Sequence, residues 1–211
     1  MTMKNRVDMG PQDIIEEINR QFDNAIIATD VGQHQMFTTQ YIEITKNKQL
    51  ITSGGLGTMG YGFPAAIGAK LGNPDKDVIA ISGDGGMQMN IQEFATAVLE
   101  ELPLILCVFN NEYLGMVRQW QDLFYGQRYS QTVLNDRVDF AKVAEGLGAK
   151  GYTVSTCEEF DNAVKEAIEL NIPVVIDAQI DKDDKVFPMV APGAPISECF
   201  GEEDVAEKFG R

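Results

Sequence analysis

The sequence predicts an α/β protein built on a doubly wound, mainly parallel sheet with helices on both faces. Short apolar runs typical of buried strands alternate with helical segments along almost the whole chain. Strands separated by helices are joined by right-handed crossovers, which place neighbouring strands parallel and cover both faces of the sheet. Neither a repeat nor a linker interrupts the 211 residues, which suffice for one sizeable core. We therefore expect one domain over residues 1–180 and an irregular tail over residues 181–211.

Residues 1–76 are expected to contain two helices and two strands. Pro11 suits the first turn of a helix over residues 11–22, whose isoleucines share one face. A helix of small residues is expected over 64–71, where Gly72-Asn73-Pro74 ends it. The strands are short apolar runs over residues 25–29 and 49–52, and a glycine-rich loop over 53–62 follows the second strand.

The rest of the chain, from residue 77 onward, repeats this alternation. Asn90 and Glu93 have the spacing of an N-cap and N3 pair, which predicts a helix over residues 90–101. We expect the polar segment 125–137 to be a loop that becomes ordered with a ligand or a partner. The remaining elements are strands over residues 77–82, 102–109, 151–154 and 173–180, and helices over residues 114–124, 139–147 and 158–170.

Charge and composition argue against several classes of function. A formal net charge of −15 argues against nucleic acid or an anionic membrane surface as the partner. No apolar run is long enough to span a bilayer and no apolar signal region opens the chain, so we expect a cytoplasmic protein. Three cysteines without a Cys-x-x-Cys spacing fit a reducing cytosol, and we assign no catalytic role to Cys107, Cys157 or Cys199.

The most informative feature is the spacing of two polar turns. Gly83-Asp84-Gly85 is followed by 24 residues and then by Asn110-Asn111, and a predicted strand precedes each turn. The carboxyl ends of parallel strands share one edge of a sheet, where ligands bind. Asp84 and Asn111 therefore offer the oxygen ligands that Mg²⁺ prefers. Gly83, Gly85 and Gly86 let backbone N–H groups approach phosphate oxygens, and the helix starting near Asn90 would add its positive end.

Taken alone, each of these turns also fits an ordinary connection between a strand and a helix. Their joint spacing favours a site for a metal and a diphosphate. Because the chain is acidic, such a site would rely on a metal and on backbone N–H groups rather than on a basic patch. The same spacing resembles the signature of thiamine diphosphate (ThDP) enzymes.

Three motifs narrow the resemblance to the large catalytic subunit of acetohydroxyacid synthase, also called acetolactate synthase. They are Gly32 to Met36 (GQHQM), Gly54 to Gly62 (GGLGTMGYG) and Asn110 to Gln121 (NNEYLGMVRQWQ). The resemblance runs from about Pro11 to Pro195, covers only the C-terminal third of that family, and implies the diphosphate-binding domain of the ThDP-binding fold. We therefore expect that the family's pyrimidine-binding and central domains are absent, and that residues 1–9 mark a truncated or restarted reading frame.

Four strand-end segments rich in Gly, Asn, Asp or Gln would form a single site if they share one edge of the sheet: residues 30–35, 53–62, 83–86 and 110–115. The resemblance implies roles for residues within it. Gln33 and His34 would donate hydrogen bonds to the diphosphate, and the carbonyl of Gly57 would accept one from the aminopyrimidine. Met59 would support the bend between the two rings of the cofactor, which presses the amino group toward the reacting carbon.

The Mg²⁺ ligands implied by the resemblance are the side chains of Asp84 and Asn111 and the backbone carbonyl of Tyr113. Tyr113 stands at a position where the family varies, which a main-chain ligand tolerates.

Met116 and Trp120 match residues that line the substrate channel of the family, and Met116 also lies beside the cofactor there. Ordinary structural explanations exist for the side chains named so far. His34 also fits a polar loop residue, Met59 a core filler, and Met116 and Trp120 helix packing. Residues 188–195 (PMVAPGAP) resemble the family's tail that folds over the active site.

The implied activity is that of a transferase of branched-chain amino-acid biosynthesis. It condenses two 2-ketoacids, pyruvate with pyruvate or with 2-ketobutyrate, with loss of CO₂. Its cofactors would be ThDP and Mg²⁺, and the full enzyme can carry FAD, whose main site lies outside this chain. We assign no catalytic residue here, because the glutamate that the chemistry needs belongs to the pyrimidine-binding domain. We expect the chain alone to be inactive and to self-associate.

Two other functions remain open from the sequence. The chain fits a separately encoded subunit of a split ThDP-dependent decarboxylase or ketoacid oxidoreductase that works with a second polypeptide. It also fits a non-catalytic binding module. The stretch Gly115 to Gln121 (GMVRQWQ) favours acetolactate synthase over other ThDP enzymes.

Overall fold

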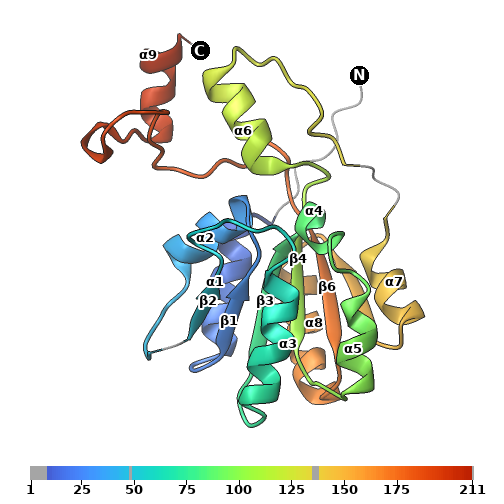
Figure 1. Ribbon diagram of the computed structural model, residues 1–211. Coiled ribbons are helices and arrows are strands. Elements are labelled where there is room, and N and C mark those ends of the chain that lie inside the picture. Colours follow the sequence, from blue (N-terminus) through green and yellow to red (C-terminus); the bar gives the residue numbers. More distant parts are fainter. Residues whose placement is uncertain (1–8, 48, 135–137, 211) are drawn as a thin grey trace.

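A computed structural model describes residues 9–47, 49–134 and 138–210. Its centre is a parallel sheet of six strands in the order β2-β1-β3-β4-β6-β5 (Figure 1). The doubly wound parallel sheet predicted from the sequence is therefore confirmed. The strand order reverses between β1 and β3, which makes the carboxyl ends of these two strands the expected place for a ligand. The strands are β1 (Ile26–Thr29), β2 (Leu50–Thr52), β3 (Val78–Gly83), β4 (Ile105–Asn110), β5 (Lys150–Val154) and β6 (Val174–Gln179).

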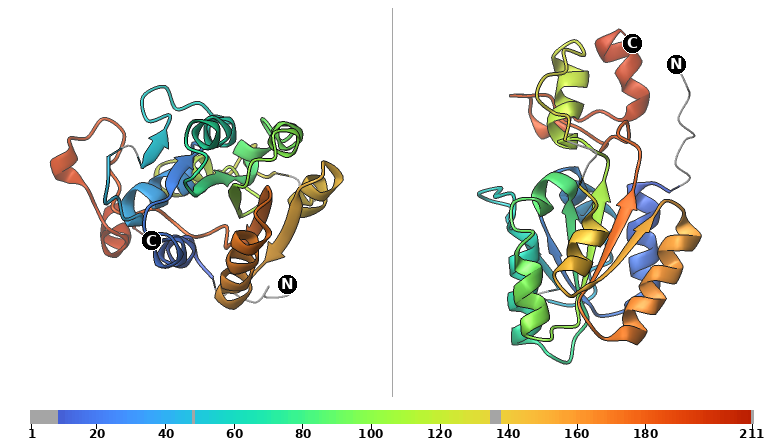
Figure 2. Two further views of the ribbon diagram at one scale, coloured as in Figure 1. Left: turned by 90° about the horizontal axis from the view of Figure 1, so that it is seen from below. Right: turned by 90° about the vertical axis from the view of Figure 1, so that its right-hand side faces the viewer.

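Helices cover both faces of the sheet (Figure 2). One face carries α1 (Pro11–Gln21), α2 (Gln33–Tyr41) and α8 (Cys157–Leu170). The other carries α3 (Gly62–Gly72), α5 (Glu93–Leu99) and α7 (Phe140–Gly146). Among the described residues, no helix has both the length and the apolar character that crossing a membrane requires.

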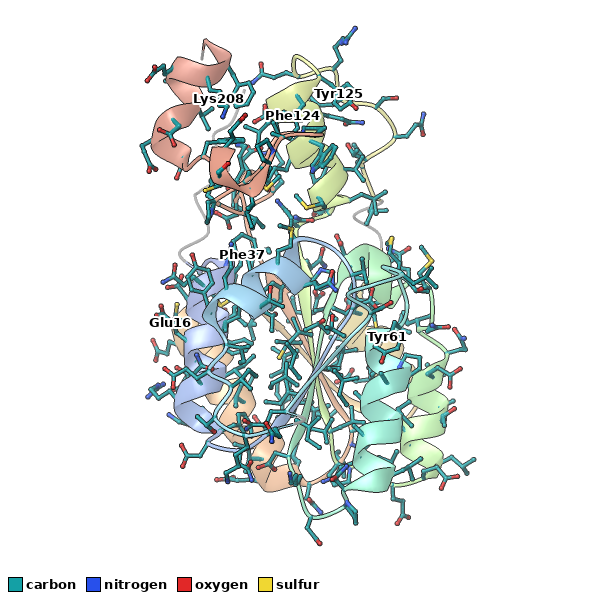
Figure 3. All side chains as sticks on the ribbon, turned by 60° about the vertical axis from the view of Figure 1, so that its left-hand side comes forward. Glu16, Phe37, Tyr61, Phe124, Tyr125 and Lys208 are labelled. Carbon is teal, nitrogen blue, oxygen red and sulfur yellow. The ribbon has the colours of Figure 1, made fainter. Side chains whose placement is uncertain are left out.

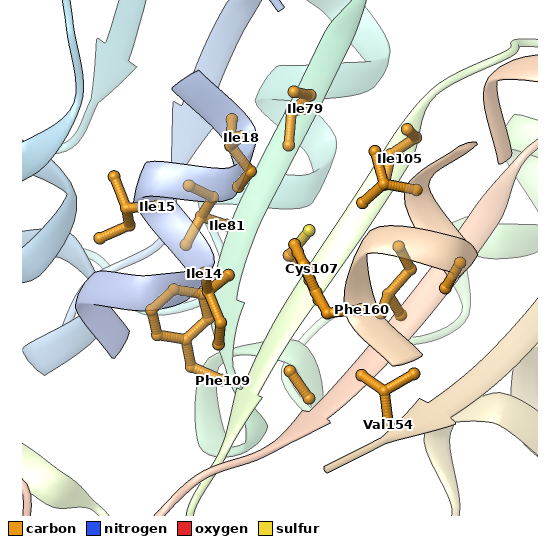
Figure 4. Close-up of a cluster of buried hydrophobic side chains, with 14 of the residues drawn as sticks. Ile14, Ile15, Ile18, Ile79, Ile81, Ile105, Cys107, Phe109, Val154 and Phe160 are labelled. Carbon is orange, nitrogen blue, oxygen red and sulfur yellow. The ribbon is translucent and has the colours of Figure 1, made fainter. Parts of the chain in front are cut away.

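The buried residues of the strands alternate between two apolar clusters, one on each face. On the α1 and α8 face, Ile14 and Ile18 of α1 and Phe160 of α8 pack with Ile79 and Cys107 of the sheet (Figure 4). Burial raises the pKa of the Cys107 thiol to about 12, so this cysteine is a neutral core residue. The strands are thus covered by apolar side chains on both faces.

A smaller group of elements lies beyond the carboxyl ends of the strands (Figure 1). It contains α4 (Asp84–Met87), α6 (Gly115–Phe124), α9 (Val205–Phe209) and two 3-10 helices, Ile196–Glu198 and Glu202–Asp204. Figure 3 shows Phe124 between α6 and α9, where its ring meets that of Phe209 at a centroid distance of 5.7 Å. Leu123, Met189 and Phe200 form the buried centre of this third cluster. The tail expected to be irregular thus contains short helices that pack on α6.

Two further local expectations need correction. The helix predicted from Asn90 begins at Glu93 and has no side-chain cap, and the Asn90 amide donates to the carbonyl of Gly60 at 2.5 Å. The helix that begins at the site is α4, which starts at Asp84 directly after β3. The sequence also did not predict α2. Within segment 125–137, residues 125–134 are described and are not helical, and residues 135–137 lie outside the described residues.

Candidate cofactor-binding site

The ends of β1, β3 and β4 surround a cavity of about 100 Å³. Its walls come from segments that follow different strands, as the strand-end argument predicted. The described lining residues include no lysine and no arginine. Those predicted from the sequence are Gln33, His34, Met59, Gly83, Asp84, Gly85, Gly86, Asn111, Tyr113 and Met116.

Asp84 is a buried carboxylate with one unsatisfied oxygen. The residue is 4% exposed and lies where β3 passes directly into the short helix α4. Oδ1 accepts a hydrogen bond from the backbone N–H of Gly85 at 2.8 Å, whereas Oδ2 has no hydrogen-bond partner. Desolvation raises the pKa of Asp84 to about 7, against the opposing effect of the Gly85 and Glu112 backbone groups. A cation at Oδ2 would stabilise the charged form.

His34 faces the same cavity with a second unsatisfied atom. It lies in the first turn of α2 and is 7% exposed. Its ring packs on the backbone of Gly83, where an added Cβ would stand 2.8 Å from Nδ1. Nε2 has no hydrogen-bond partner, and desolvation lowers the pKa of His34 to about 4 although Asp30 opposes this shift. His34 and Asp84 both line this cavity, and each carries a buried polar atom without a partner. This favours a polar ligand there, because such groups are normally hydrogen-bonded.

The turn after β4 brings the other predicted metal ligands to the cavity. Asn110 ends β4, and its Oδ1 accepts from the N–H of Glu112 at 3.3 Å, where the chain takes a positive φ of 64°. Oδ1 of Asn111 accepts from the N–H of Tyr113 at 3.0 Å. The backbone of Glu112 lies close enough to Asp84 to lower its pKa. Asn111, named by the sequence spacing, and Tyr113, named by the resemblance, thus line the same cavity as Asp84.

The side chains at this turn that could bind a metal ion carry little negative charge. Among the described residues, no group of three or more His, Cys, Asp or Glu side chains could hold a metal ion. A metal bound at Asp84 would need neutral oxygens and oxygens of the ligand itself, which is how Mg²⁺ commonly binds beside phosphates.

Gln33 lies on the cavity but is already bonded within the protein. Its Nε2 donates to Oε1 of Gln119 at 2.7 Å and to the carbonyl of Asp184 at 3.0 Å. An amide nitrogen carries two hydrogens, so both donors of Gln33 are used here. The residue connects α2 to α6 and to the tail in this structure.

Gly57 and Trp120, both predicted from the resemblance, do not line the cavity. Gly57 lies in the exposed part of the glycine-rich loop with a φ of 68°. Trp120 packs edge-on against Phe124 at 5.4 Å and lines a separate open hollow of about 660 Å³. Met116 borders both hollows, so it lies between the cavity and Trp120.

Sequence reasoning included Asp30 and Leu114 in the strand-end segments but gave neither a role, and it missed Asp184. Leu114 and Asp184 line the cavity, and Asp30 lies behind it, 1% exposed. The position of Asp30 at the end of a predicted strand was the available signal for its burial at the site. Nothing local in the sequence indicates that Asp184, in the tail, reaches the cavity.

The chain resembles known proteins over the part that forms this site. Residues 30–178 match the family described as "Thiamine pyrophosphate enzyme, C-terminal TPP binding domain". The acetolactate synthase large subunit of Porphyra purpurea is 42% identical over 199 residues, covering 94% of this chain and 34% of that protein. The acetolactate synthase isozyme 1 large subunit of Escherichia coli K12 is 46% identical over 180 residues, covering 85% of this chain and 32% of that protein.

A solved structure has a similar fold. The thiamine diphosphate-dependent 4-hydroxybenzoylformate decarboxylase of Rhodococcus jostii RHA1 matches with a TM-score of 0.79 and 24% identity, covering 88% of this chain and 35% of that chain. The likeness concerns the fold alone at this identity. The chain spans about a third of the length of the curated relatives it matches.

Proposed function

The chain belongs to the family of C-terminal TPP-binding domains of thiamine pyrophosphate enzymes, and we propose that it binds thiamine diphosphate (the same compound) together with Mg²⁺ in the cavity between β1, β3 and β4. The observation that carries this proposal is the pair of buried atoms without partners, Oδ2 of Asp84 and Nε2 of His34. A diphosphate bridged to a dication offers partners to both atoms. The residues present therefore fit the group.

The electrostatics of the cavity support a metal as part of the ligand. The net charge of the chain is −15, and no lysine or arginine is found among the described lining residues. A diphosphate entering this cavity alone would meet the Asp84 carboxylate unscreened. A dication held by Asp84, Asn111 and the carbonyl of Tyr113 removes this repulsion, and the backbone N–H groups of the glycine turn bind the remaining phosphate oxygens.

We further propose that the chain serves an acetolactate synthase, in which two 2-ketoacids such as pyruvate and 2-ketobutyrate are joined with loss of CO₂ in branched-chain amino-acid biosynthesis. The identities of 42% and 46% to acetolactate synthase large subunits support this assignment. Bound ThDP would supply the chemistry at the substrate carbon that carries the carboxyl group and loses it as CO₂. The residues of this chain hold the diphosphate and the metal, orient the rings through Met59, and border the substrate through Met116 and Trp120. Three free cysteines support a cytoplasmic setting.

A partner completes the site in this proposal. Exposed apolar side chains lie on the segments around the cavity, with Leu56 90%, Val117 47% and Tyr125 51% exposed. We propose that they contact a pyrimidine-binding domain, which supplies the catalytic glutamate, and that the chain also self-associates through such surfaces. Sedimentation velocity across a concentration series tests the second point, because a monomer at every concentration would contradict self-association.

Calorimetry tests the binding itself. We expect ThDP to bind the 211-residue chain in the presence of Mg²⁺ and to bind far more weakly with a chelator. Asp84→Ala should abolish the effect of Mg²⁺, because the remaining neutral ligands do not offset dehydration of a hard dication. Asp161→Ala is the control, since Asp161 lies on α8 and pairs with Lys165 and Arg20 at the surface. Equal Mg²⁺-dependent binding by wild type and Asp84→Ala would refute the metal site.

A further inference from the structure

The carboxylate of Asp30 is fully engaged by backbone groups behind the cofactor cavity. Asp30 follows β1 and is 1% exposed. Its Oδ1 accepts from the N–H groups of Val31 at 2.8 Å and Gly60 at 3.0 Å, and its Oδ2 accepts from the N–H of Gly62 at 2.9 Å. A buried carboxylate is stabilised by several N–H donors of this kind. Asp30 thus fastens the end of β1 to a loop that follows another strand.

The same carboxylate also contacts the turn after β3. A Cβ added at Gly86 would stand 2.3 Å from Oδ1 of Asp30, so only a glycine allows this approach. Gly86 lines the cofactor cavity. Asp30 therefore joins three segments that surround the cavity: the end of β1, the loop 53–62 and the start of α4.

Two of the hydrogen bonds that hold the loop 53–62 are made by Gly60, the residue after Met59. The N–H of Gly60 belongs to the peptide group that follows Met59, and the carbonyl of Gly60 accepts from Nδ2 of Asn90 at 2.5 Å. Both polar groups of Gly60 are therefore held. Met59 lines the cavity, and its Cε would be 3.5 Å from a Cβ at Gly85. These two bonds hold the backbone immediately after Met59.

The rest of the loop is held less firmly. Residues 54–58 are exposed, with Leu56 at 90%, and the loop closes on itself through the N–H of Gly57, which donates to the carbonyl of Ser53 at 3.0 Å. The firm attachment of the loop to the domain thus lies at Gly60 and Gly62. Because Gly62 is also the first residue of α3, the Asp30 carboxylate sits at the positive end of that helix as well.

We propose that Asp30 is a positioning residue that sets Met59 against the ring part of the cofactor, so that it determines affinity for the rings of ThDP but not for its diphosphate. This inference rests on the proposed function. Asp30 reaches the cavity through Gly60 and Met59, and it does not itself line the cavity.

The test compares ThDP with inorganic diphosphate, both with Mg²⁺, by calorimetry on the 211-residue chain. Asp30→Asn keeps the size of the side chain but replaces one acceptor by an NH₂ group, which would face the N–H of Gly60 or Gly62. An unsatisfied buried donor of this kind corresponds to roughly a tenfold loss in an equilibrium constant. We expect ThDP to bind about tenfold more weakly, whereas inorganic diphosphate binds as well as to wild type or slightly better, because one negative charge near the cavity has been removed.

Two further variants keep the proposal falsifiable if Asp30→Asn folds poorly. Asn90→Ala removes the bond to the carbonyl of Gly60 from a half-buried position and should show the same selective loss of ThDP affinity, to a smaller extent. Lys70→Met is the matched control. Lys70 is 6% exposed, and its ammonium group donates to the carbonyls of Pro74 and Lys76 at 2.9 and 2.7 Å. It lies near the amino ends of the strands, away from the cofactor cavity.

The outcomes separate this inference from the proposed function. A wild-type chain that binds neither ligand refutes the proposed function. Equal losses of ThDP and diphosphate affinity in Asp30→Asn, or no loss of either, overturn the positioning role while leaving the proposed function intact. A selective loss of ThDP affinity in Lys70→Met overturns it too, because general loosening of the fold would then explain the effect.

Discussion

Asn110 and Asp177 form a buried pair next to the proposed metal site, with Nδ2 of Asn110 donating to Oδ1 of Asp177 at 2.9 Å. Asn110 is the last residue of β4, and Asp177 lies two residues before the end of the neighbouring strand β6. Asn110 is 8% exposed and Asp177 is 3% exposed. This bond orients the Asn110 amide so that its Oδ1 accepts from the N–H of Glu112. The resulting turn sets the positions of Asn111 and of the Tyr113 carbonyl.

Replacing Asn110 should therefore weaken metal binding without touching a metal ligand. In Asn110→Ala we expect the Mg²⁺ concentration for half-maximal ThDP binding to rise by about tenfold, because the Glu112 turn loses its acceptor. The free energy of unfolding should fall by about 1–3 kcal/mol, since the buried Asp177 carboxylate loses the Asn110 donor and keeps only the Gln179 side chain. Thermal melts and Mg²⁺ titrations measure the two effects.

Asn73→Ala is the matched control for this variant. The Asn73 amide donates to the carbonyl of Ala69 at 3.0 Å at the far end of α3. It should lower stability without changing the Mg²⁺ requirement, and an equal change in that requirement would contradict the role given to Asn110.

The pH dependence of stability should reveal the buried Asp84 carboxylate in metal-free buffer. Its pKa is about 7 in the folded chain and near 3.8 when unfolded, so the folded state binds more protons between these values. The contribution of Asp84 to stability is then present at low pH and is lost as the pH rises toward 7, by at most about 1.4 kcal/mol per pH unit. His34, with a pKa lowered to about 4, acts in the opposite direction, so wild type must be compared with a variant.

Asp84→Asn lacks this titration. We expect its stability relative to wild type to increase as the pH rises from about 4 to about 7, so that it melts above wild type at neutral pH in a chelator. Adding Mg²⁺ and diphosphate should reverse the order of the two melting temperatures, because the ligand stabilises wild type. A stability difference that does not change with pH would contradict a raised pKa of Asp84 in the folded chain.

Gln119 should hold the tail to the domain. It is 2% exposed, and its side-chain amide pairs with both backbone groups of Val186, at 2.9 and 2.8 Å, while also accepting from Gln33. In Gln119→Leu these buried groups lose their partners, so we expect a loss of about 3 kcal/mol in the free energy of unfolding. Limited proteolysis should cut the segment after residue 182 faster than in wild type.

The matched control is Gln121→Leu on the same helix. Gln121 bonds the backbone of the exposed residue Ser130 at 2.9 and 3.1 Å, and its loss should leave the tail protected. Equal protection of the tail in Gln119→Leu and wild type would show that the third apolar cluster alone holds it.

The chain by itself should not form acetolactate from pyruvate. The proposed chemistry needs a protein carboxyl group that is hydrogen-bonded to the aminopyrimidine ring of the cofactor. No residue of this chain is assigned that role. Without it, the rate should lose the factor of about 10²–10⁴ that general acid–base catalysis provides. A colorimetric acetolactate assay with ThDP and Mg²⁺ measures this, and adding a separately made pyrimidine-binding domain of the same family should restore some activity. Robust turnover by the 211-residue chain alone would contradict the prediction, and Glu112 would be the first glutamate to replace.

The sequence alone determined the parallel sheet and the segments that meet at its edge. Strand and helix periodicities are local, and parallel strands must present their carboxyl ends together, so the spacing from Asp84 to Asn111 was enough to place both side chains on one cavity. The sequence did not reveal α2, because the segment Gln33–Tyr41 is mostly polar and lacks a clear apolar stripe.

The tertiary structure decided the contacts between polar groups far apart in the chain. The side chain of Asn90 donates to the carbonyl of Gly60, although it was expected to cap a helix. The side chain of Gln33 donates to Gln119 and to the tail. The carboxylate of Asp30 accepts from the loop beside Met59. A polar side chain has several local partners of similar energy, and which one it takes depends on the burial that the complete fold imposes. The general form of the site follows from local pattern, whereas the bonds that hold it in place arise only when distant segments pack together.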